Sequence, residues 1–212
     1  MFSVHRMQAI GRKARIFANN FKIKAGFSST VAVEASHGSY GGAVQFLHWT
    51  MGGSVLGCFA YVNMAQQEKD KKLKMDYMFM HKSFGTLAAA LLVPRLVMRV
   101  TSKSAGQISQ ELWVRAAAGL SHLSMYGFLI LMPVTGVTMG YFGGKGLPFF
   151  STTLPGAQGD AKDGKLAGRA FKLHKQFGWY MEVLFMAHLG GVAFHLARGE
   201  AILARILPFG PK

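Results

Sequence analysis

The chain has 212 residues, of which 50% are hydrophobic and only 16% are charged. Soluble domains carry about 25% charged residues, so this composition argues against an ordinary soluble protein. The net charge of +15 raises the question of nucleic acid, but the sequence has no recognisable nucleic-acid module and no basic helix interleaved with exposed aromatic residues. We therefore exclude nucleic acid as a partner.

The first 40 residues are predicted to be a leader. Residues 1–30 contain six Lys or Arg and no acidic residue, and Phe and Ile recur in them at helical spacing. This pattern is typical of a mitochondrial transit peptide, while a retained basic tail lying on anionic lipid is the alternative. We predict that residues 1–40 are a transit peptide followed by a flexible segment. His5 and His37 then have no role in a site, and the mature protein lies in the mitochondrial inner membrane.

Four stretches of the remaining chain are apolar enough to cross a membrane. Residues 46–65 and 116–142 contain no charged residue, and residues 78–98 and 174–197 contain only a few. A helical span needs about 20 apolar residues. We therefore predict an all-α membrane protein whose domain, residues 41–212, is a four-transmembrane-helix bundle in the lipid bilayer. A soluble protein with buried helices is the alternative.

The connections and the single cysteine carry no recognised motif. The connection 143–173 is rich in glycine and contains two prolines, so we expect a loop, with a short helix before His174. Its GGKG sequence lacks the spacing of a phosphate-binding loop. Cys58 lies within the first span, and the absence of CxxC and CxxCH from the sequence excludes those motifs for cysteine-bound zinc and covalent c-type haem.

Six histidines lie in or beside the predicted spans: His48, His81, His122, His174, His188 and His195. An ionisable side chain in hydrocarbon is costly, so these residues need partners. HKSFG begins at His81, HKQFG at His174 and the looser HWTMG at His48, and we expect all three histidines near helix starts. The glycine one helical turn after each histidine leaves room for a flat ring on that face. Chance recurrence in a glycine-rich chain is the alternative.

Helix geometry groups four of these histidines into two pairs. His174 and His188 are fourteen residues apart, which places them on one helix face at levels about 21 Å apart. Antiparallel threading brings His81 to the level of His174, and His48 to the level of His188. Two imidazoles on either side of an iron give a six-coordinate b-type haem suited to electron transfer. We predict that His81 and His174 bind one haem iron, and that His48 and His188 bind the other.

Arg95 is the predicted partner of a haem propionate. It lies fourteen residues after His81, and so faces inward at the level of the second site. An arginine within a span needs a counter-charge, which a propionate supplies through charge-assisted hydrogen bonds; pairing with Glu182 is the alternative. We expect Pro94 to kink the helix beside it. For Glu182 itself we favour a partner role for an arginine or a hydroxyl over proton handling.

The order of these motifs resembles the prokaryotic-type cytochrome b561 family. The resemblance covers about residues 40–208 and rests on LHW, HKSFGTLAAALLVPRLVMR, HLSMYGFLILMPVTGVTMGYF with its Pro133 and Gly136, and LHK…AHLGGVAFH. It implies that the four paired histidines bind two b haems within a four-helix bundle. It also implies an oxidoreductase that passes electrons from superoxide to ubiquinone, although other members are cytochrome b partners of hydrogenases or dehydrogenases.

The two remaining histidines, His122 and His195, match family positions that do not bind haem. We interpret them as a candidate quinone site, because imidazole can hydrogen-bond a quinone carbonyl and move protons. Satisfied interface histidines are the alternative, and His195 lies near enough to His188 to compete for the second haem. Lys82 and Lys175 could attract an anionic donor such as superoxide, or could reach lipid headgroups.

The function predicted from the sequence is therefore electron transfer through two b haems. The chain is expected to carry electrons across the membrane between superoxide, or another one-electron donor, and ubiquinone. The alternative is an accessory or anchor subunit of a respiratory chain complex, in which the haem is structural or absent.

Overall fold

The computed structural model describes residues 40–102 and 111–207. The predicted transit peptide, with His5 and His37, lies outside the described residues except for Tyr40. Four long helices form most of the structure: α2 (Gly42–Gln67), α3 (Lys71–Thr101), α4 (Leu112–Phe142) and α5 (Gly164–Ala197). The shorter elements are β1 (Leu147–Phe149), β2 (Thr152–Leu154), the 3₁₀ helix η1 (Gly159–Ala161) and α6 (Ile202–Ile206).

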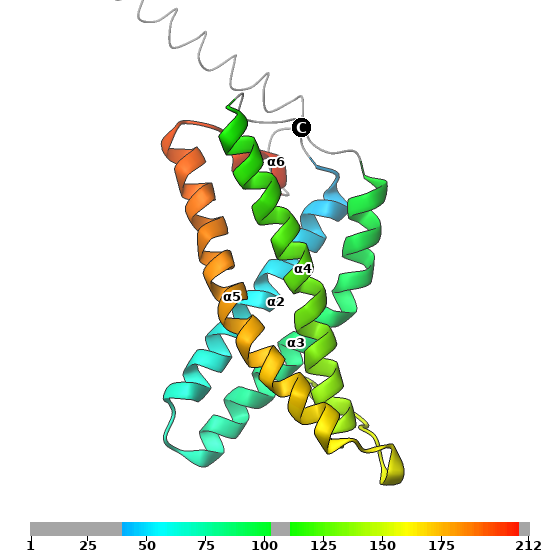
Figure 1. The fold of residues 1–212 in the computed structure, drawn as a ribbon. Helices are drawn as coiled ribbons and strands as arrows, with labels where there is room; N and C mark the ends of the chain where they lie inside the picture. The colour runs from blue at the N-terminus through cyan, green and yellow to red at the C-terminus, as the bar shows by residue number, and fades with distance from the viewer. Residues whose placement is uncertain (1–39, 103–110, 208–212) are drawn as a thin grey trace, which may run out of the picture.

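The long helices pack as two pairs that cross each other (Figure 1). α2 lies along α3, and α4 lies along α5, while contacts between the two pairs are far fewer. α6 ties the end of α5 to the start of α2, since the indole N–H of Trp49 donates to the carbonyl of Ile206 at 2.9 Å. This crossing leaves space between the pairs, and that space holds the candidate site.

Three helical stretches in the described residues are long and apolar enough to cross a membrane, namely Lys71–Thr101, Leu112–Phe142 and Gly159–Ala197. Their large apolar side chains are mostly turned outward, and Trp113 and Trp179 are examples of exposed residues. Such a surface is unfavourable in water and expected in lipid. The chain is therefore a multi-pass membrane protein. α2 carries no charged residue but is not among the three stretches, because polar residues such as His48 and Asn63 lower its hydropathy.

The helices begin earlier than the hydropathy pattern predicts. The expectation that His81 and His174 lie at helix starts is wrong: each lies ten residues inside its helix, which begins at Lys71 or Gly164. Aspartate caps explain both beginnings. A side-chain oxygen of Asp70, and likewise of Asp163, accepts a hydrogen bond at 2.8 Å from the backbone N–H three residues later, which satisfies a free donor of the first turn.

The proline in α3 does not end that helix. The α3 helix continues past Pro94 to Thr101 and changes direction along its length (Figure 1). An interior proline removes one backbone hydrogen bond and so favours such a bend.

The connection 143–173 is more ordered than the predicted loop. It contains the antiparallel hairpin β1–β2, in which Leu147 pairs with Leu154, and the helix expected before His174 is the first part of α5. Gly146 leads into β1 in a left-handed conformation (φ 73°), and glycine is needed there because a Cβ would clash with the carbonyl oxygen of Leu154. The backbone N–H of Phe150 donates to the hydroxyl of Ser83 at 3.0 Å, which fastens the hairpin to α3.

Candidate functional site

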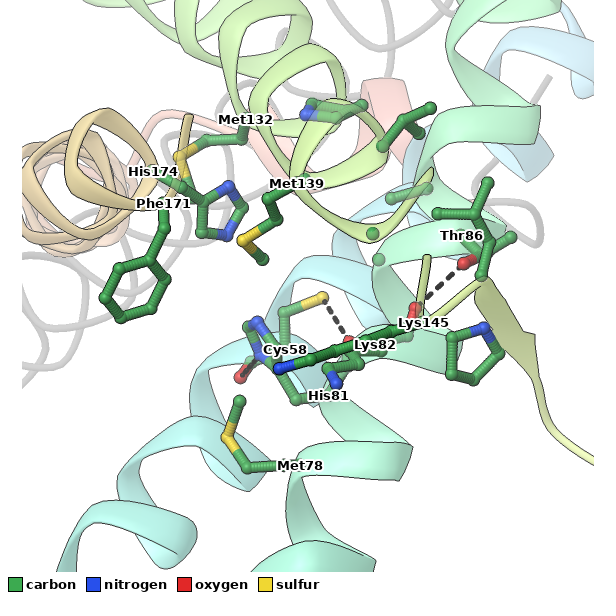
Figure 2. Close-up of a pocket in the computed structure, with 18 of the residues that line it drawn as sticks. Cys58, Met78, His81, Lys82, Thr86, Met132, Met139, Lys145, Phe171 and His174 are labelled. Atoms are coloured by element: carbon green, nitrogen blue, oxygen red, sulfur yellow. Dashed lines mark hydrogen bonds between the residues drawn. The ribbon is translucent and has the colours of Figure 1, made fainter. Parts of the chain in front are cut away.

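A cavity of about 490 Å³ lies between the two helix pairs, a volume within the range of small-molecule sites. Its walls come from α2, α3, α4, α5 and the segment leading into β1, and they are largely apolar. His81 and His174 lie on opposite sides of this space (Figure 2). The structure thus brings together the first predicted histidine pair in a cavity large enough for a cofactor.

The ring of His81 is held by the backbone of the neighbouring helix. Its Nδ1 lies 2.9 Å from the carbonyl oxygen of Cys58, and because a carbonyl can only accept, Nδ1–H is the donor. The thiol of Cys58 donates in return to the carbonyl of His81 at 3.6 Å. The proton on Nδ1 leaves a lone pair on Nε2, the nitrogen available to bind a metal.

The ring of His174 is held in the same tautomer by Thr135 of α4. The Thr135 hydroxyl donates to the carbonyl of Leu131 at 2.8 Å, so it accepts from Nδ1–H of His174 at 2.9 Å. The same face of α4 has no side chain at Gly136, where a Cβ would lie only 3.3 Å from Cε1 of His174. Thr135 therefore orients the ring and Gly136 gives it room.

The two rings fit the separation that a shared iron requires. Their centroids are 6.2 Å apart and their planes are nearly perpendicular, at 84°. A metal–imidazole bond is about 2 Å long, so two such bonds and the two half-rings give a centroid separation of about 6 Å. Outer hydrogen bonds to the second nitrogen, as found here for both rings, are the usual support of metal-binding histidines. The donor set therefore fits a bis-histidine haem.

The second predicted pair, His48 and His188, is less well arranged than the first to share one iron. His188 is in ring contact with His122, at a centroid separation of 5.7 Å. His48 lies within electrostatic range of both rings, but its Nδ1 accepts a hydrogen bond from Arg95 at 3.2 Å. An arginine can only donate, so this contact places the imidazole proton of His48 on Nε2. In this arrangement Nε2 of His48 is not free to bind a metal.

Arg95 and Glu182 do not pair with each other in the contacts described. Arg95 donates to the carbonyl of Val44 at 3.1 Å as well as to His48. Glu182 instead accepts a hydrogen bond from the side-chain amide of Asn63 at 3.2 Å. The described partner of Glu182 is thus an amide and not the arginine or hydroxyl expected from the sequence, and Arg95 lies near the second histidine group.

His195 lies in a polar network at the end of α5. Its Nδ1 bonds a carboxylate oxygen of Glu200, and Arg198 bridges Glu200 to Glu111 at the start of α4, at 3.0 and 2.7 Å. The hydrogen bond from Arg198 holds the pKa of the Glu111 carboxyl below its usual range. The two members of the candidate quinone site thus have different surroundings, since His122 lies beside His188.

The fold, the cavity and the histidine pair agree with a family comparison. A family model for prokaryotic cytochrome b561 matches residues 39–209. The chain belongs to the prokaryotic cytochrome b561 family. None of the curated proteins compared matches the chain significantly. As a member of the cytochrome b561 family, the chain is a membrane electron-transfer protein of the b-haem type.

Several residues of the site were not recognised from the sequence. The sequence assigns Cys58 no motif, yet it holds His81 through two hydrogen bonds. Thr135 lies inside the PVTG motif, but nothing in the motif says that its hydroxyl meets a histidine 39 residues later. Lys145 lines the cavity from the loop after α4, where glycine-rich sequence suggested no site. Lys82 also lines the cavity, whereas Lys175 is exposed.

Replacing Thr135 with valine is expected to weaken haem binding at the His81–His174 pair. Valine has a similar shape but cannot accept the Nδ1 proton of His174, and loss of such an outer partner typically lowers metal affinity by about 10–100-fold. Haem retention during dilution in detergent would measure the loss. Thr135→Ser keeps the hydroxyl and is the matched control, so equal retention in the valine and serine variants would contradict the role assigned to Thr135.

Proposed function

We propose that this cytochrome b561 family member is a di-haem b cytochrome that moves single electrons across a membrane. His81 and His174 would hold one haem, and His48 and His188 would hold the other. α2 would be the fourth transmembrane helix, because it contributes His48 and packs along α3. When bound, each haem supplies a one-electron iron couple.

The observation that carries the proposal is the His81–His174 pair. The centroid separation of 6.2 Å, together with a hydrogen bond at each Nδ1, leaves two Nε2 atoms for one metal. Because both rings are already held, binding there costs little reordering of the protein. A haem held by both histidines would supply electron transfer rather than chemistry at the metal.

Arg95 would have a second partner in the loaded protein. We propose that it turns from Nδ1 of His48 to a haem propionate, since a carboxylate is a stronger partner for a guanidinium than a neutral imidazole. This movement would free His48 to present a lone pair to iron. The ring contact between His122 and His188 makes His122 a competing ligand for this site, whereas His195, the competitor expected from the sequence, bonds Glu200.

The electron donor and acceptor in this proposal are superoxide, or another one-electron donor, and ubiquinone. Lys82 at the cavity would favour an anionic donor. The His195–Glu200 pair, in which an imidazole bonds a carboxylate, is a group able to exchange a proton with a reduced quinone. The basic leader supports the mitochondrial inner membrane as the location.

The competing function is an accessory subunit of a respiratory complex. The broad apolar exposure on α4 and α5 would then be covered in part by partner helices rather than by lipid. Activity of the isolated protein separates the two functions, because a subunit is expected to be inert without its complex.

A reduced-minus-oxidised spectrum with pyridine haemochrome quantitation tests the proposal on the detergent-purified protein. We expect two b haems per chain and reduction by superoxide, followed by reoxidation with a soluble ubiquinone analogue. A protein prepared with an adequate haem supply that contains no b haem would refute electron transfer. Two haems without superoxide or quinone reactivity would refute the donor and acceptor only.

A further inference from the structure

Two lysines meet at the edge of the cavity. Lys82 of α3 and Lys145 from the loop after α4 line both this cavity and a neighbouring hollow of about 260 Å³. Their side chains lie near each other beside His81 (Figure 2), close enough for their charges to interact. Two like charges in a partly enclosed space repel each other, so an anion between them would relieve the repulsion.

Hydrogen bonds within the fold hold Lys82 and Lys145 close together. The amide of Phe150 donates to Ser83, the residue after Lys82, and so docks the hairpin on this part of α3. The hydroxyl of Ser83 in turn donates to the carbonyl of Phe79, and Ser83 is fully buried. At the other end of the loop, the backbone N–H of Lys145 donates to the carbonyl of Gly140 in α4. Lys145 is therefore brought to Lys82 by one anchor on each helix, the hydroxyl of Ser83 in α3 and the carbonyl of Gly140 in α4.

The lysines have no counter-charge in the described part of the chain. Neither ammonium group makes an ion pair or a hydrogen bond to a described residue. No Asp or Glu of the described residues lines either hollow. The pair is thus a preformed site for an anion that no described residue supplies.

The position of the lysine pair relative to the two histidines indicates which anion it binds. Lys82 follows His81 directly, so its side chain leaves α3 about 100° around the helix from the ligand ring. It therefore lies to the side of the His81–His174 axis, where the edge of a flat ring held between the histidines would be. The carboxylates of a haem project from its edge, and each ammonium group can donate up to three hydrogen bonds to them.

We propose that Lys82 and Lys145 bind the propionate carboxylates of the haem held by His81 and His174. This inference rests on the proposed function. The shared chemistry is a carboxylate-sized anion between two ammonium groups, and a free small anion such as superoxide is the other source. Propionate binding would also make this haem easier to reduce, because fixed positive charge near it stabilises the added electron.

Redox titration of the full chain in detergent distinguishes the two sources of the anion, a haem propionate and a free small anion. The variants are Lys82→Gln, Lys145→Gln and their combination, with Lys162→Gln as the control, because Lys162 packs on the same loop at Gly144 but does not line the cavity. Comparison with His188→Ala assigns which midpoint potential belongs to the His81–His174 haem. We expect that potential to shift negative in each single variant and further in the double variant, with no shift in the control.

Other outcomes would overturn the inference. An unchanged potential with a slower reaction towards superoxide alone would assign the lysines to the free anion. An unchanged potential with unchanged rates would leave the pair without an anion role. If a glutamine variant loses the haem, Lys82→Arg or Lys145→Arg is expected to restore it, and loss in both forms would also contradict the inference. A wild-type protein without b haem would instead refute the proposed function.

Discussion

Replacing His174 with alanine is expected to remove one of two b haems and to leave the other in place. His174 supplies one of the two Nε2 atoms in the cavity between the two helix pairs. Its partner His81 lies across that cavity at a ring-centroid separation of 6.2 Å. Alanine would remove one of the two side chains that would hold the haem there, so that haem should be lost. Pyridine haemochrome quantitation should fall to about half of the wild-type value.

The same measurement on His188→Ala tests the second site. Loss of the other haem is expected. The haem lost in His188→Ala should differ in spectrum and in midpoint potential from the haem lost in His174→Ala, because Arg95 is near one site and Lys82 near the other. His48→Ala should reproduce the loss seen in His188→Ala. His122→Ala is the discriminating control, since His122 is in ring contact with His188. Haem loss in His122→Ala with retention in His48→Ala would move the ligand role to His122.

Replacing Gly57 with alanine is expected to destabilise the α2–α3 pair. A Cβ at Gly57 would lie 2.8 to 2.9 Å from three atoms of the Phe84 ring. That ring cannot move freely, because it stacks on the ring of Tyr61 at a centroid separation of 5.7 Å and packs edge to face with the ring of Phe150 at a centroid separation of 5.3 Å. Overpacking of this kind costs about 1–3 kcal/mol, against a gain of about 1 kcal/mol from replacing glycine within a helix.

Thermal unfolding in detergent measures this effect, with Gly53→Ala as the matched control. Gly53 lies one helical turn earlier in α2, and a Cβ there would have no neighbour within 4 Å. We expect Gly53→Ala to keep or raise the unfolding midpoint and Gly57→Ala to lower it. Haem loss from the main cavity should accompany the lower midpoint, because Phe84 lies one turn after His81. Equal midpoints in the two variants would show that the ring moves away without cost.

The sequence alone determined the membrane class, the helical character and the family. Long uncharged stretches predict spans because hydrocarbon excludes charge, and the histidine order with HKSFG and HKQFG was enough to recognise the family confirmed by the match over residues 39–209. The fourteen-residue spacing between His174 and His188 also follows from helix geometry. These features are local, so the chain displays them without its fold.

The helix limits needed local contacts that hydropathy does not see. Asp70 and Asp163 start their helices ten residues before the expected ligands, because capping is a matter of hydrogen bonds rather than of apolar content. The hairpin in residues 143–173 was missed for a related reason. Its strands are only three residues long, and they are held by pairing and by the bond between Phe150 and Ser83 rather than by a strand pattern.

Only the tertiary structure decided how each histidine is held. The carbonyl of Cys58 and the hydroxyl of Thr135 fix the tautomers of His81 and His174, yet neither lies near its histidine in the sequence. Arg95 was expected to face the second site, but its hydrogen bond to His48, and the resulting tautomer, depend on how α2 packs on α3. Lys145 joins Lys82 through a folded hairpin. Such partners are set by packing between distant segments, and sequence periodicity encodes only the face of each helix.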